Sequence, residues 1–394
     1  MSRVVDSFLK LKAYCEAEQY KGWDPYDGLN SKVFDILPVK KWNVARLIWI
    51  QGFKRSPINF RKLLLVPKQY NSKGLALFLS GYCNLHAIAK SGNSTFGDVS
   101  ALEQNIKTLA NLLLERQNTK YSGACWGYNF DWQARLSFLF PRETPTVVAT
   151  SFCVDALLRA YKITGEERYL TAAISSAKFV MNDLNRSELN NGFLFSYSPL
   201  NGNNTVINAS LLGAKILCQV YQFTREEELK NTASKTIRAC CDLQTKEGSW
   251  VYGLLPVQSW IDSFHTGYNL DAIQAYQNIT NDFSYSKNIE KGLRYYLKTF
   301  FMEDGTPKYY HDQTYPIDIH CPGQLFVTLS KTKSFREHEN LAKKVMRWTL
   351  ENMQDPKGYF YYQLKKGLSS KISYMRWSNA FMFNAMSYYL KGIN

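Results

Sequence analysis

The chain has 394 residues, 45% of them hydrophobic and 15% aromatic, which supplies a large apolar core and excludes a disordered protein. Its formal net charge of +15 favours anionic partners, such as acidic glycans or a membrane surface. The basic residues are scattered, and the chain has no zinc-finger spacing, RNA-recognition motif or basic tail, so nucleic-acid binding is not expected.

The hydropathy pattern and the cysteines indicate a reducing, aqueous location. No stretch approaches the ~18 uninterrupted apolar residues that a membrane helix needs. The start, MSRVVDSFLKLKAYCEAEQY, mixes charges into its apolar positions, unlike a signal peptide. The eight cysteines lack the spacing of a disulfide framework, and most lie in helix-like apolar patterns. We therefore expect a cytoplasmic protein with reduced cysteines.

Residues 1–70 are expected to form helices and a turn-rich loop that pack on the rest of the chain. The stretch GWDPYDGLNS, which begins at Gly22, contains the Gly, Pro, Asp and Asn residues typical of ordered turns. The stretch VARLIWIQGFKRSPINFRKLLL follows and indicates a helix, a turn and a second helical start. No linker separates a second domain, so residues 1–394 are expected to form a single domain.

Turns that combine glycine with aromatic residues recur after amphipathic helices. Their glycines are Gly123, Gly192, Gly248, Gly305 and Gly358. A second helical stretch follows each turn, so each repeat is expected to hold an inner helix, an outer helix and a short two-stranded turn. A period of roughly 55–60 residues is long for tetratricopeptide or HEAT units. It favours an all-α (α/α)6 toroid, a closed ring of six helical hairpins whose sixth member is completed by the N-terminal segment.

The starts of the inner helices differ between repeats. Some repeats carry Ala, Ser or Thr there, which need only to pack. Others carry reactive or bulky side chains, namely Asp262, His265, Asp318, His320, Cys321, Arg376 and Trp377. In a closed ring these helix starts converge on one mouth of the central cavity, and helix N-termini add a positive potential that suits an anionic ligand. We expect His265, Asp262, Asp318, His320 and Arg376 to be catalytic.

Structural roles remain open for the same residues. Asp262 and Asp318 immediately precede their helices, so N-capping explains them as well as chemistry does. A lone histidine is more often structural than catalytic, which applies to His265 and His320. Arg376 could bind a carboxylate or phosphate of a ligand, or it could pair with one of the two aspartates.

A second group of residues is expected to bind substrate. Tryptophans at turns can stack on sugar faces, and amides bond well to hydroxyl-rich ligands. Asp131 and Arg135 are four residues apart, which suits either the rim of a cavity or an ordinary helical ion pair. The predicted binding residues are Trp126, Asp131, Trp132, Arg135, Asn208, Trp260 and Trp377.

Helical toroids also host two other chemistries, zinc-dependent cyclisation and terpene cyclisation. Cys125, His265, His320 and Cys321 could in principle meet around zinc, as a similar set does in lanthionine cyclases. The His-Cys order differs here, so no metal or other cofactor is expected, and a zinc enzyme stays a less favoured alternative. The Gln-x3-Gly-x-Trp pattern is similar to triterpene cyclase repeats, but the acidic motifs of terpene cyclisation are missing.

The stretches GWDPYDGLNS, WGYNFDWQAR, TPTVVATSF, SWIDSFHTGYNL and YMRWSNAFMFNAMSYYL together resemble a bacterial family of six-hairpin glycosidase-like toroids. That family is found with exopolysaccharide and capsule biosynthesis genes, and the similarity runs over nearly the whole chain. Its members often carry the label delta-aminolevulinic acid dehydratase, a chemistry of β/α barrels, whereas this chain shows no alternation of strands and helices. The resemblance implies the toroid fold and a glycan context.

Two classes of function follow. The first is an enzyme that acts on an acidic oligo- or polysaccharide. Hydrolysis would use paired carboxylates from Asp262, Asp318 and Asp131, whereas a lyase or uronic-acid epimerase would use a base such as His265, with Arg376 or Asn208 stabilising the enolate-like carboxylate. The second class is a non-catalytic glycan-binding or scaffold protein of the same pathway. Peripheral association with a membrane biosynthesis complex is compatible with either class.

Overall fold

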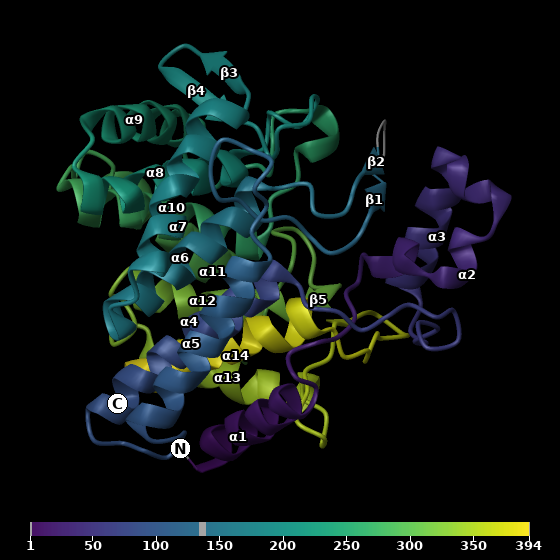
Figure 1. Cartoon of the computed structure of the whole chain (residues 1–394). Coiled ribbons are helices and arrows are strands. Elements are labelled where there is room, and N and C mark those ends of the chain that lie inside the picture. The colour runs from purple at the N-terminus through teal and green to yellow at the C-terminus, as the bar shows by residue number, and fades with distance from the viewer. Residues whose placement is uncertain (1, 134–138, 394) are drawn as a thin grey trace.

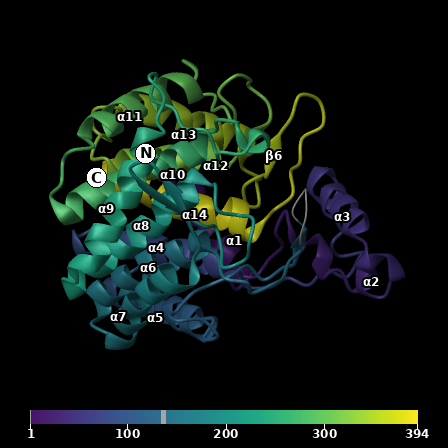
Figure 2. The ribbon, with the colours of Figure 1, turned by 90° about the horizontal axis from the view of Figure 1, so that it is seen from above.

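The computed structural model describes residues 2–133 and 139–393 and forms a ring of helices (Figures 1 and 2). The inner helices are α4 (Ser72–Lys90), α6 (Val147–Thr164), α8 (Ile207–Thr224), α10 (Ser263–Thr280), α12 (His320–Lys331) and α14 (Phe381–Ile393). Each inner helix packs against the next, and α14 packs against α4, so the ring is closed. The predicted (α/α)6 toroid is confirmed.

The outer helices are α1 (Ser2–Ala17), α5 (Val99–Glu115), α7 (Glu167–Lys178), α9 (Glu227–Asp242), α11 (Ser286–Phe300) and α13 (Glu339–Met353). Sequence decides which layer a helix joins. In α11 the buried residues are Ile289, Gly292, Tyr296 and Phe300, a single stripe at helical spacing. In α8 nearly every residue from Ile207 onward is buried, because it packs against neighbours on all sides.

The turn glycines fasten each repeat to the next. A Cβ atom on Gly248 would lie 2.5 Å from the carbonyl oxygen of Lys291 in α11, and one on Gly358 would lie 2.5 Å from that of Lys10 in α1. Both glycines also have positive φ, at 108° and 101°. The same approach to an outer helix recurs at Gly123, Gly192 and Gly305. Because Gly358 meets α1, the N-terminal helix occupies the outer position beside α14.

The glutamines four residues before two of these glycines explain the Gln-x3-Gly pattern. The Nε2 of Gln244 donates to the carbonyls of Gly248 and Asn288, both at 3.0 Å. In the last turn, Nε2 of Gln354 donates to the carbonyls of Gly358 at 3.0 Å and Ser7 at 3.1 Å. Each amide therefore closes its own turn and bonds to the neighbouring outer helix.

The predicted two-stranded turn is complete in one repeat, where β3 (Arg186–Leu189) pairs antiparallel with β4 (Gly192–Phe195). Elsewhere it shrinks to single bridges, such as Phe301 with Pro307. Two further pairs of short strands are β1 (Trp132–Gln133) with β2 (Leu139–Phe140), and β5 (Ile317–Asp318) with β6 (Gln363–Leu364). Two π-helical turns also occur, η3 (Phe179–Asp183) after α7 and η5 (Met375–Ala380) before α14.

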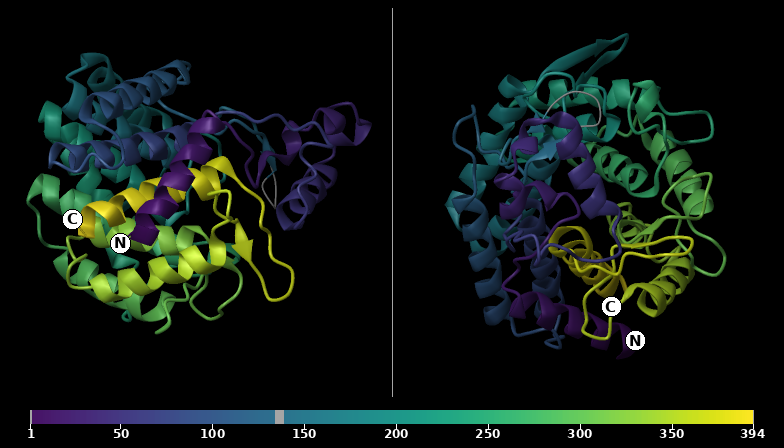
Figure 3. Two further views of the ribbon diagram at one scale, coloured as in Figure 1. Left: turned by 90° about the horizontal axis from the view of Figure 1, so that it is seen from below. Right: turned by 90° about the vertical axis from the view of Figure 1, so that its right-hand side faces the viewer.

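Residues 31–66, which we call the arm, stand beside the ring (Figures 1 and 3). The arm contains α2 (Lys32–Asp35), η2 (Pro38–Lys41) and α3 (Asn43–Arg55), and it follows the short helix η1 (Asp27–Asn30); a further 3-10 turn, η4, spans Pro256–Gln258. Phe34 and Ile50 of the arm form a small apolar cluster with Leu29 of η1, which we call the apolar cluster of the arm. In the described part of the chain, no helix has the length and apolarity to cross a bilayer.

We expect Gly248→Ala to lower the free energy of unfolding by at least about 2 kcal/mol, because alanine strains the positive φ and its methyl group overlaps the Lys291 carbonyl. Chemical denaturation followed by circular dichroism measures the change. Gly52→Ala is the control, since a methyl group there meets nothing within 4 Å. Equal stability of the Gly248 variant and the wild type would contradict the fastening role of the turn.

Candidate functional site

The inner helices begin at the end of the ring that faces the arm (Figure 3). Residues far apart in sequence meet there. The ring of Phe264 lies 5.0 Å from that of His320 and 6.2 Å from that of Trp377, measured between centroids. The starts of α10, α12 and α14 therefore share one mouth.

Asp262 and His265 form a hydrogen-bonded pair at the start of α10. One carboxylate oxygen of Asp262 caps the helix by accepting the backbone N–H of His265 at 3.0 Å. The other oxygen bonds to Nδ1 of His265 at 2.7 Å and accepts Nε1–H of Trp260 at 3.1 Å. The Asp262 side chain therefore both caps α10 and positions the imidazole of His265.

This pairing leaves the second imidazole nitrogen of His265 open. A carboxylate on Nδ1 favours the tautomer with its proton there, so the lone pair lies on Nε2. The His265 side chain is 21% exposed, whereas that of Asp262 is fully buried. A base with a fixed tautomer and an accessible lone pair can accept a proton from a bound molecule.

Aromatic rings surround His265. Tyr252, Phe264 and Tyr268 have ring centroids 4.8, 4.1 and 5.8 Å from the imidazole. Trp260 stacks on Tyr252, with centroids 4.5 Å apart and planes 14° from parallel. Flat apolar walls of this kind suit a ligand with apolar ring faces.

Asp318 is a buried hydrogen-bond acceptor that positions its neighbours. Its Oδ1 accepts the backbone N–H of His320 and Nε1–H of Trp377, each at 2.9 Å. Its Oδ2 accepts Nε2–H of Gln363 at 2.7 Å. Burial nevertheless raises the pKa of the Asp318 carboxyl to about 6, because these hydrogen bonds offset only part of the lost hydration. Direct action of Asp318 on substrate, which the sequence predicts, does not fit its complete burial.

His320 is also buried, and it holds Trp377 in place. Its Nε2–H donates to the carbonyl of Trp377 at 2.8 Å, and its ring stacks between Trp377 and Phe381 at centroid distances of 4.2 and 3.9 Å. Burial, with Lys73 and Arg376 nearby, lowers the pKa of His320 well below its usual value. These contacts position Trp377, while the catalytic role of His320 stays a prediction.

Arg376 is occupied by an acid that the sequence analysis did not single out. Its Nε and one terminal nitrogen donate to the two oxygens of Asp24 at 2.5 and 2.7 Å, with both side chains buried. The guanidinium also lies 5.0 Å from the Trp377 ring centroid and 5.1 Å from that of Tyr128. Arg376 thus ties the GWDPYDGLNS loop to the sixth inner helix instead of facing substrate freely. The acid-rich loop was the only sequence signal for Asp24.

Lys73, in the first turn of α4, is a second residue that the sequence analysis missed. It is buried and makes no ion pair with any described carboxylate. Its Nζ donates to the Tyr268 hydroxyl at 3.2 Å and lies 4.3 Å from the Phe152 ring centroid. Burial and the nearby Arg376 lower the pKa of Lys73 well below its usual value. A lysine in an apolar helix start is the signal that could have identified it.

The remaining predicted binding residues are more dispersed. Trp260 lies in the mouth, as does Trp377. Trp126 has no exposed surface and donates its Nε1–H to the carbonyl of Leu113, so it belongs to the core and not to a binding surface. Asn208 is buried in the first turn of α8, and its Oδ1 has no hydrogen-bond partner among the described residues.

The loop that contains Asp131 and Trp132 lies toward the arm. Asp131 accepts the backbone N–H of Arg142 at 2.7 Å. Trp132 has its ring centroid 6.3 Å from that of Tyr26 and packs on the apolar cluster of the arm. Arg135 lies outside the described residues, and so does its predicted pairing with Asp131.

The zinc alternative does not fit the geometry. Among residues 2–133 and 139–393, no three His, Cys, Asp or Glu side chains are grouped so that they could hold a metal ion. The Sγ of Cys125 lies 3.7 Å from the carbonyl of Asn118, and Nε2 of His320 is bonded to Trp377. All eight cysteines are free and buried.

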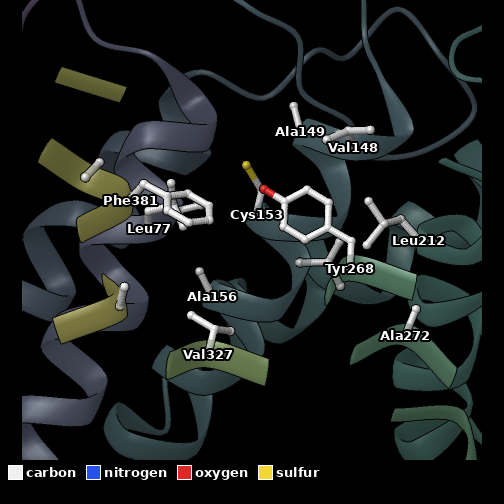
Figure 4. Close-up of a cluster of buried hydrophobic side chains, with 14 of the residues drawn as sticks. Leu77, Val148, Ala149, Cys153, Ala156, Leu212, Tyr268, Ala272, Val327 and Phe381 are labelled. Carbon is white, nitrogen blue, oxygen red and sulfur yellow. The ribbon is translucent and has the colours of Figure 1, made fainter. Parts of the chain in front are cut away.

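Side chains fill the axis of the ring below the mouth. Figure 4 shows Tyr268, Phe381, Val327 and Leu212 pointing in from different inner helices. The cavity that remains along the axis is ≈ 30 Å³, room for about one water molecule. A larger cavity of ≈ 330 Å³ lies at the side, between α1 and residues 57–68, and none of the predicted site residues borders it. A ligand that reaches His265 must therefore approach from the mouth.

Comparisons with known proteins identify the fold. No protein-family model matches the sequence, and no curated protein matches it. The structure is similar to that of cellobiose 2-epimerase from Bacillus thermoamylovorans B4167, with a TM-score of 0.60 and 14% identity over 80% of this chain and 87% of that one. It is also similar to a family 76 glycoside hydrolase from a bovine Bacteroides thetaiotaomicron strain, with a TM-score of 0.59 and 13% identity over 82% of this chain and 69% of the other.

A third similar structure is an unsaturated glucuronyl hydrolase specific for heparin, with a TM-score of 0.56 and 12% identity over 80% of this chain and 85% of that chain. Identities this low show a shared fold and nothing finer. The chain therefore has the (α/α)6 toroid of these proteins.

We expect Asp318→Asn to change the pH dependence of stability. An unfolded aspartate titrates near pH 4, whereas folded Asp318 titrates at about 6. Between these values the folded state binds more protons, so the contribution of Asp318 to stability falls as pH rises. Asparagine does not titrate, so the variant should gain up to about 2 kcal/mol relative to wild type from pH ~4 to pH ~7.

Urea denaturation across this pH range measures the difference. Asp98→Asn is the matched control, because Asp98 is an exposed N-cap that accepts the backbone N–H of Ala101. Parallel stability curves for Asp318→Asn and wild type would contradict the raised carboxyl pKa.

Proposed function

We propose that this protein is an enzyme that abstracts a proton from an acidic saccharide, as an epimerase or a lyase. The observation that carries the proposal is the accessible Nε2 of His265, whose Nδ1 is held by Asp262 at 2.7 Å. An imidazole held this way is positioned to act as a general base. The proposal places the reaction at the mouth, against the walls formed by Trp260, Tyr252 and Tyr268.

Hydrolysis is the less favoured reaction because the carboxylates are already occupied. Glycoside hydrolysis needs one carboxyl group to protonate the leaving oxygen and another to act at the sugar carbon or on water. Asp262 accepts hydrogen bonds on both oxygens, and so does Asp318. Neither is free to take up the two roles.

Lys73 supports an acidic substrate. Abstraction of the proton on the carbon next to a carboxylate moves an electron pair into an enolate, and a nearby ammonium group stabilises the added charge. Lys73 and His265 both contact Tyr268. The Nζ of Lys73 lies 3.2 Å from the Tyr268 hydroxyl, and the ring centroids of His265 and Tyr268 are 5.8 Å apart. A carboxylate in the mouth would supply the counter-ion that Lys73 lacks.

The two outcomes of the reaction differ in the second step. Return of a proton to the opposite face of the enolate gives the epimer. Departure of the neighbouring oxygen substituent with its electron pair gives an unsaturated sugar, the product of a lyase. The similar structures include a sugar epimerase, which is compatible with the first outcome, and a glucuronyl hydrolase, whose name links the fold to an acidic sugar but to hydrolysis.

The sequence resemblance supports a place for this activity in surface polysaccharide production. We propose that the enzyme acts in the cytoplasm, at the periphery of a membrane biosynthesis complex. The net charge of +15 is consistent with such an acidic substrate and setting.

We expect the wild type to introduce deuterium from heavy water into uronic-acid oligosaccharides, detected by NMR, and His265→Ala to abolish this exchange. Asp262→Asn should lower kcat by about 10²–10⁴-fold, because the amide keeps the helix cap and loses the anionic partner of His265. Asp98→Asn is the control and should not change kcat, because Asp98 caps a helix in the same way but does not pair with a histidine.

Two results would contradict the proposal of proton abstraction. Bond cleavage without deuterium incorporation would identify a hydrolase instead. Binding of the same oligosaccharides in a calorimeter, without exchange or new product, would identify a glycan-binding or scaffold protein.

Lys73→Met is expected to raise KM for a uronic-acid substrate by roughly tenfold to a hundredfold, since a hydrogen bond to a charged group contributes about 1.5–3 kcal/mol. Steady-state kinetics measure the effect. The control is Lys230→Met, which should not change KM, because Lys230 is a half-buried lysine of α9 paired with Glu227. An unchanged KM for the Lys73 variant would show that the lysine has only a structural role.

A further inference from the structure

The arm exposes an unusual amount of apolar surface. Its exposed large apolar side chains are Ile36, Trp42, Val44, Ile48, Ile58, Phe60, Leu63 and Leu65. Several are more than 60% exposed, among them Ile36 at 81% and Leu63 at 74%. Single exposed apolar residues are ordinary, but a gathering of them on one segment indicates an interaction surface.

The arm is also strongly basic, and its one acidic residue, Asp35, pairs with Lys40 at 3.5 Å. Residues 36–65 contain no Asp or Glu, and their charged residues are Lys40, Lys41, Arg46, Lys54, Arg55, Arg61 and Lys62. Lys41, Arg55 and Lys62 are exposed and make no ion pair with any described residue. The surface thus combines exposed apolar groups with uncompensated positive charge.

In helix α3 the exposed apolar side chains do not take part in the packing of the arm. Ile50 and Phe53 are buried on its inner face, where Trp49 stacks on Phe34 with centroids 4.7 Å apart. Val44, Ile48 and Arg55 lie on the opposite face at helical spacing and are exposed. The main packing partners of α3 are η1, η2 and β1 and not the ring helices, so its outer face is left uncovered.

The arm is held firmly at its base. Buried Arg61 donates to Asp27 at 2.6 Å, to the backbone carbonyl of Asp24 at 2.7 Å and to the Tyr374 hydroxyl at 3.0 Å. The Ser31 hydroxyl donates to the carbonyl of Leu64 at 2.6 Å, which joins the two ends of the arm. The exposed apolar groups are therefore presented on a fixed support.

We infer that the arm binds the surface of an anionic lipid bilayer. Apolar side chains, among them Trp42, enter the boundary between headgroups and acyl chains, while Lys41, Arg55 and Lys62 meet anionic headgroups. A second copy of this chain fits less well as the occupant, because it would bring two sets of unpaired cations together. This inference stands apart from the proposed reaction, since it involves no residue of the His265 pair.

The arm also adjoins the mouth. Lys54 donates to the Tyr26 hydroxyl at 2.8 Å, and the Tyr26 ring centroid is 5.6 Å from that of Trp377. A protein bound to lipid by the arm holds the mouth close to the membrane surface (Figure 3).

Flotation with vesicles tests the inference in the full-length protein without any sugar. Vesicles of phosphatidylglycerol mixed with phosphatidylcholine should carry the wild type, phosphatidylcholine alone should carry far less, and added salt should weaken binding. The charge variant Lys41→Gln/Arg55→Gln/Lys62→Gln and the apolar variant Trp42→Ser/Ile48→Ser/Leu63→Ser should each weaken binding by at least about tenfold.

A matched control replaces one exposed apolar residue and one exposed cation on the other end of the ring, Phe283→Ser with Lys287→Gln, and should bind as the wild type does. Circular dichroism confirms that each variant is folded. No binding to anionic vesicles would overturn the inference. If the apolar variant instead abolishes a concentration-dependent dimer seen by light scattering, while vesicles bind nothing, the arm joins two copies of the chain.

Discussion

The buried ion pair between Asp24 and Arg376 connects the parts of the molecule on which a site depends. It joins a loop near the start of the chain to the start of the sixth inner helix, and the residue numbers of the partners differ by 352. Arg61 reinforces this junction, because it donates to the backbone carbonyl of Asp24 and to the Tyr374 hydroxyl. Removal of one partner from such a pair leaves a buried charge unpaired, at a cost of about 3–5 kcal/mol. The arm, the mouth and the ring closure all rely on this junction.

The polar residues of the mouth fall into two kinds, buried residues that position their neighbours and residues that keep a reactive atom available. Asp262, Asp318 and His320 have little or no exposed surface, and each holds another side chain in place. His265 keeps one nitrogen accessible, and the buried amine of Lys73 has no ion-pair partner among the described residues. A site needs both kinds of residue, because a reactive group is useful only if its neighbours fix its geometry. The same division explains why only some of the polar helix starts face the mouth.

The sequence predicted the ring because its evidence is local and repeated. The glycine turns and the apolar helices recur along the chain, and two of the turns share a preceding glutamine, so the repeat is visible without knowledge of distant contacts. The sequence likewise placed Asp262 and His265 at the start of one helix, but it did not predict the hydrogen bond between their side chains. Partners far along the chain gave no such signal, which is why Asp24 was missed as the partner of Arg376. Trp126 and Trp260 both sit near turns, and only the three-dimensional packing buries the first.

The position of α1 has a consequence for how the molecule assembles. Because α1 packs beside α13 and α14, the last hairpin is built from the two ends of the chain (Figure 1). The neighbouring hairpins can form from contacts close in sequence, whereas this one must overcome the loop-closure entropy of nearly the entire polypeptide. We therefore regard the joining of the first helix to the last as the final event of folding, after which the remaining hairpins are locked against unravelling.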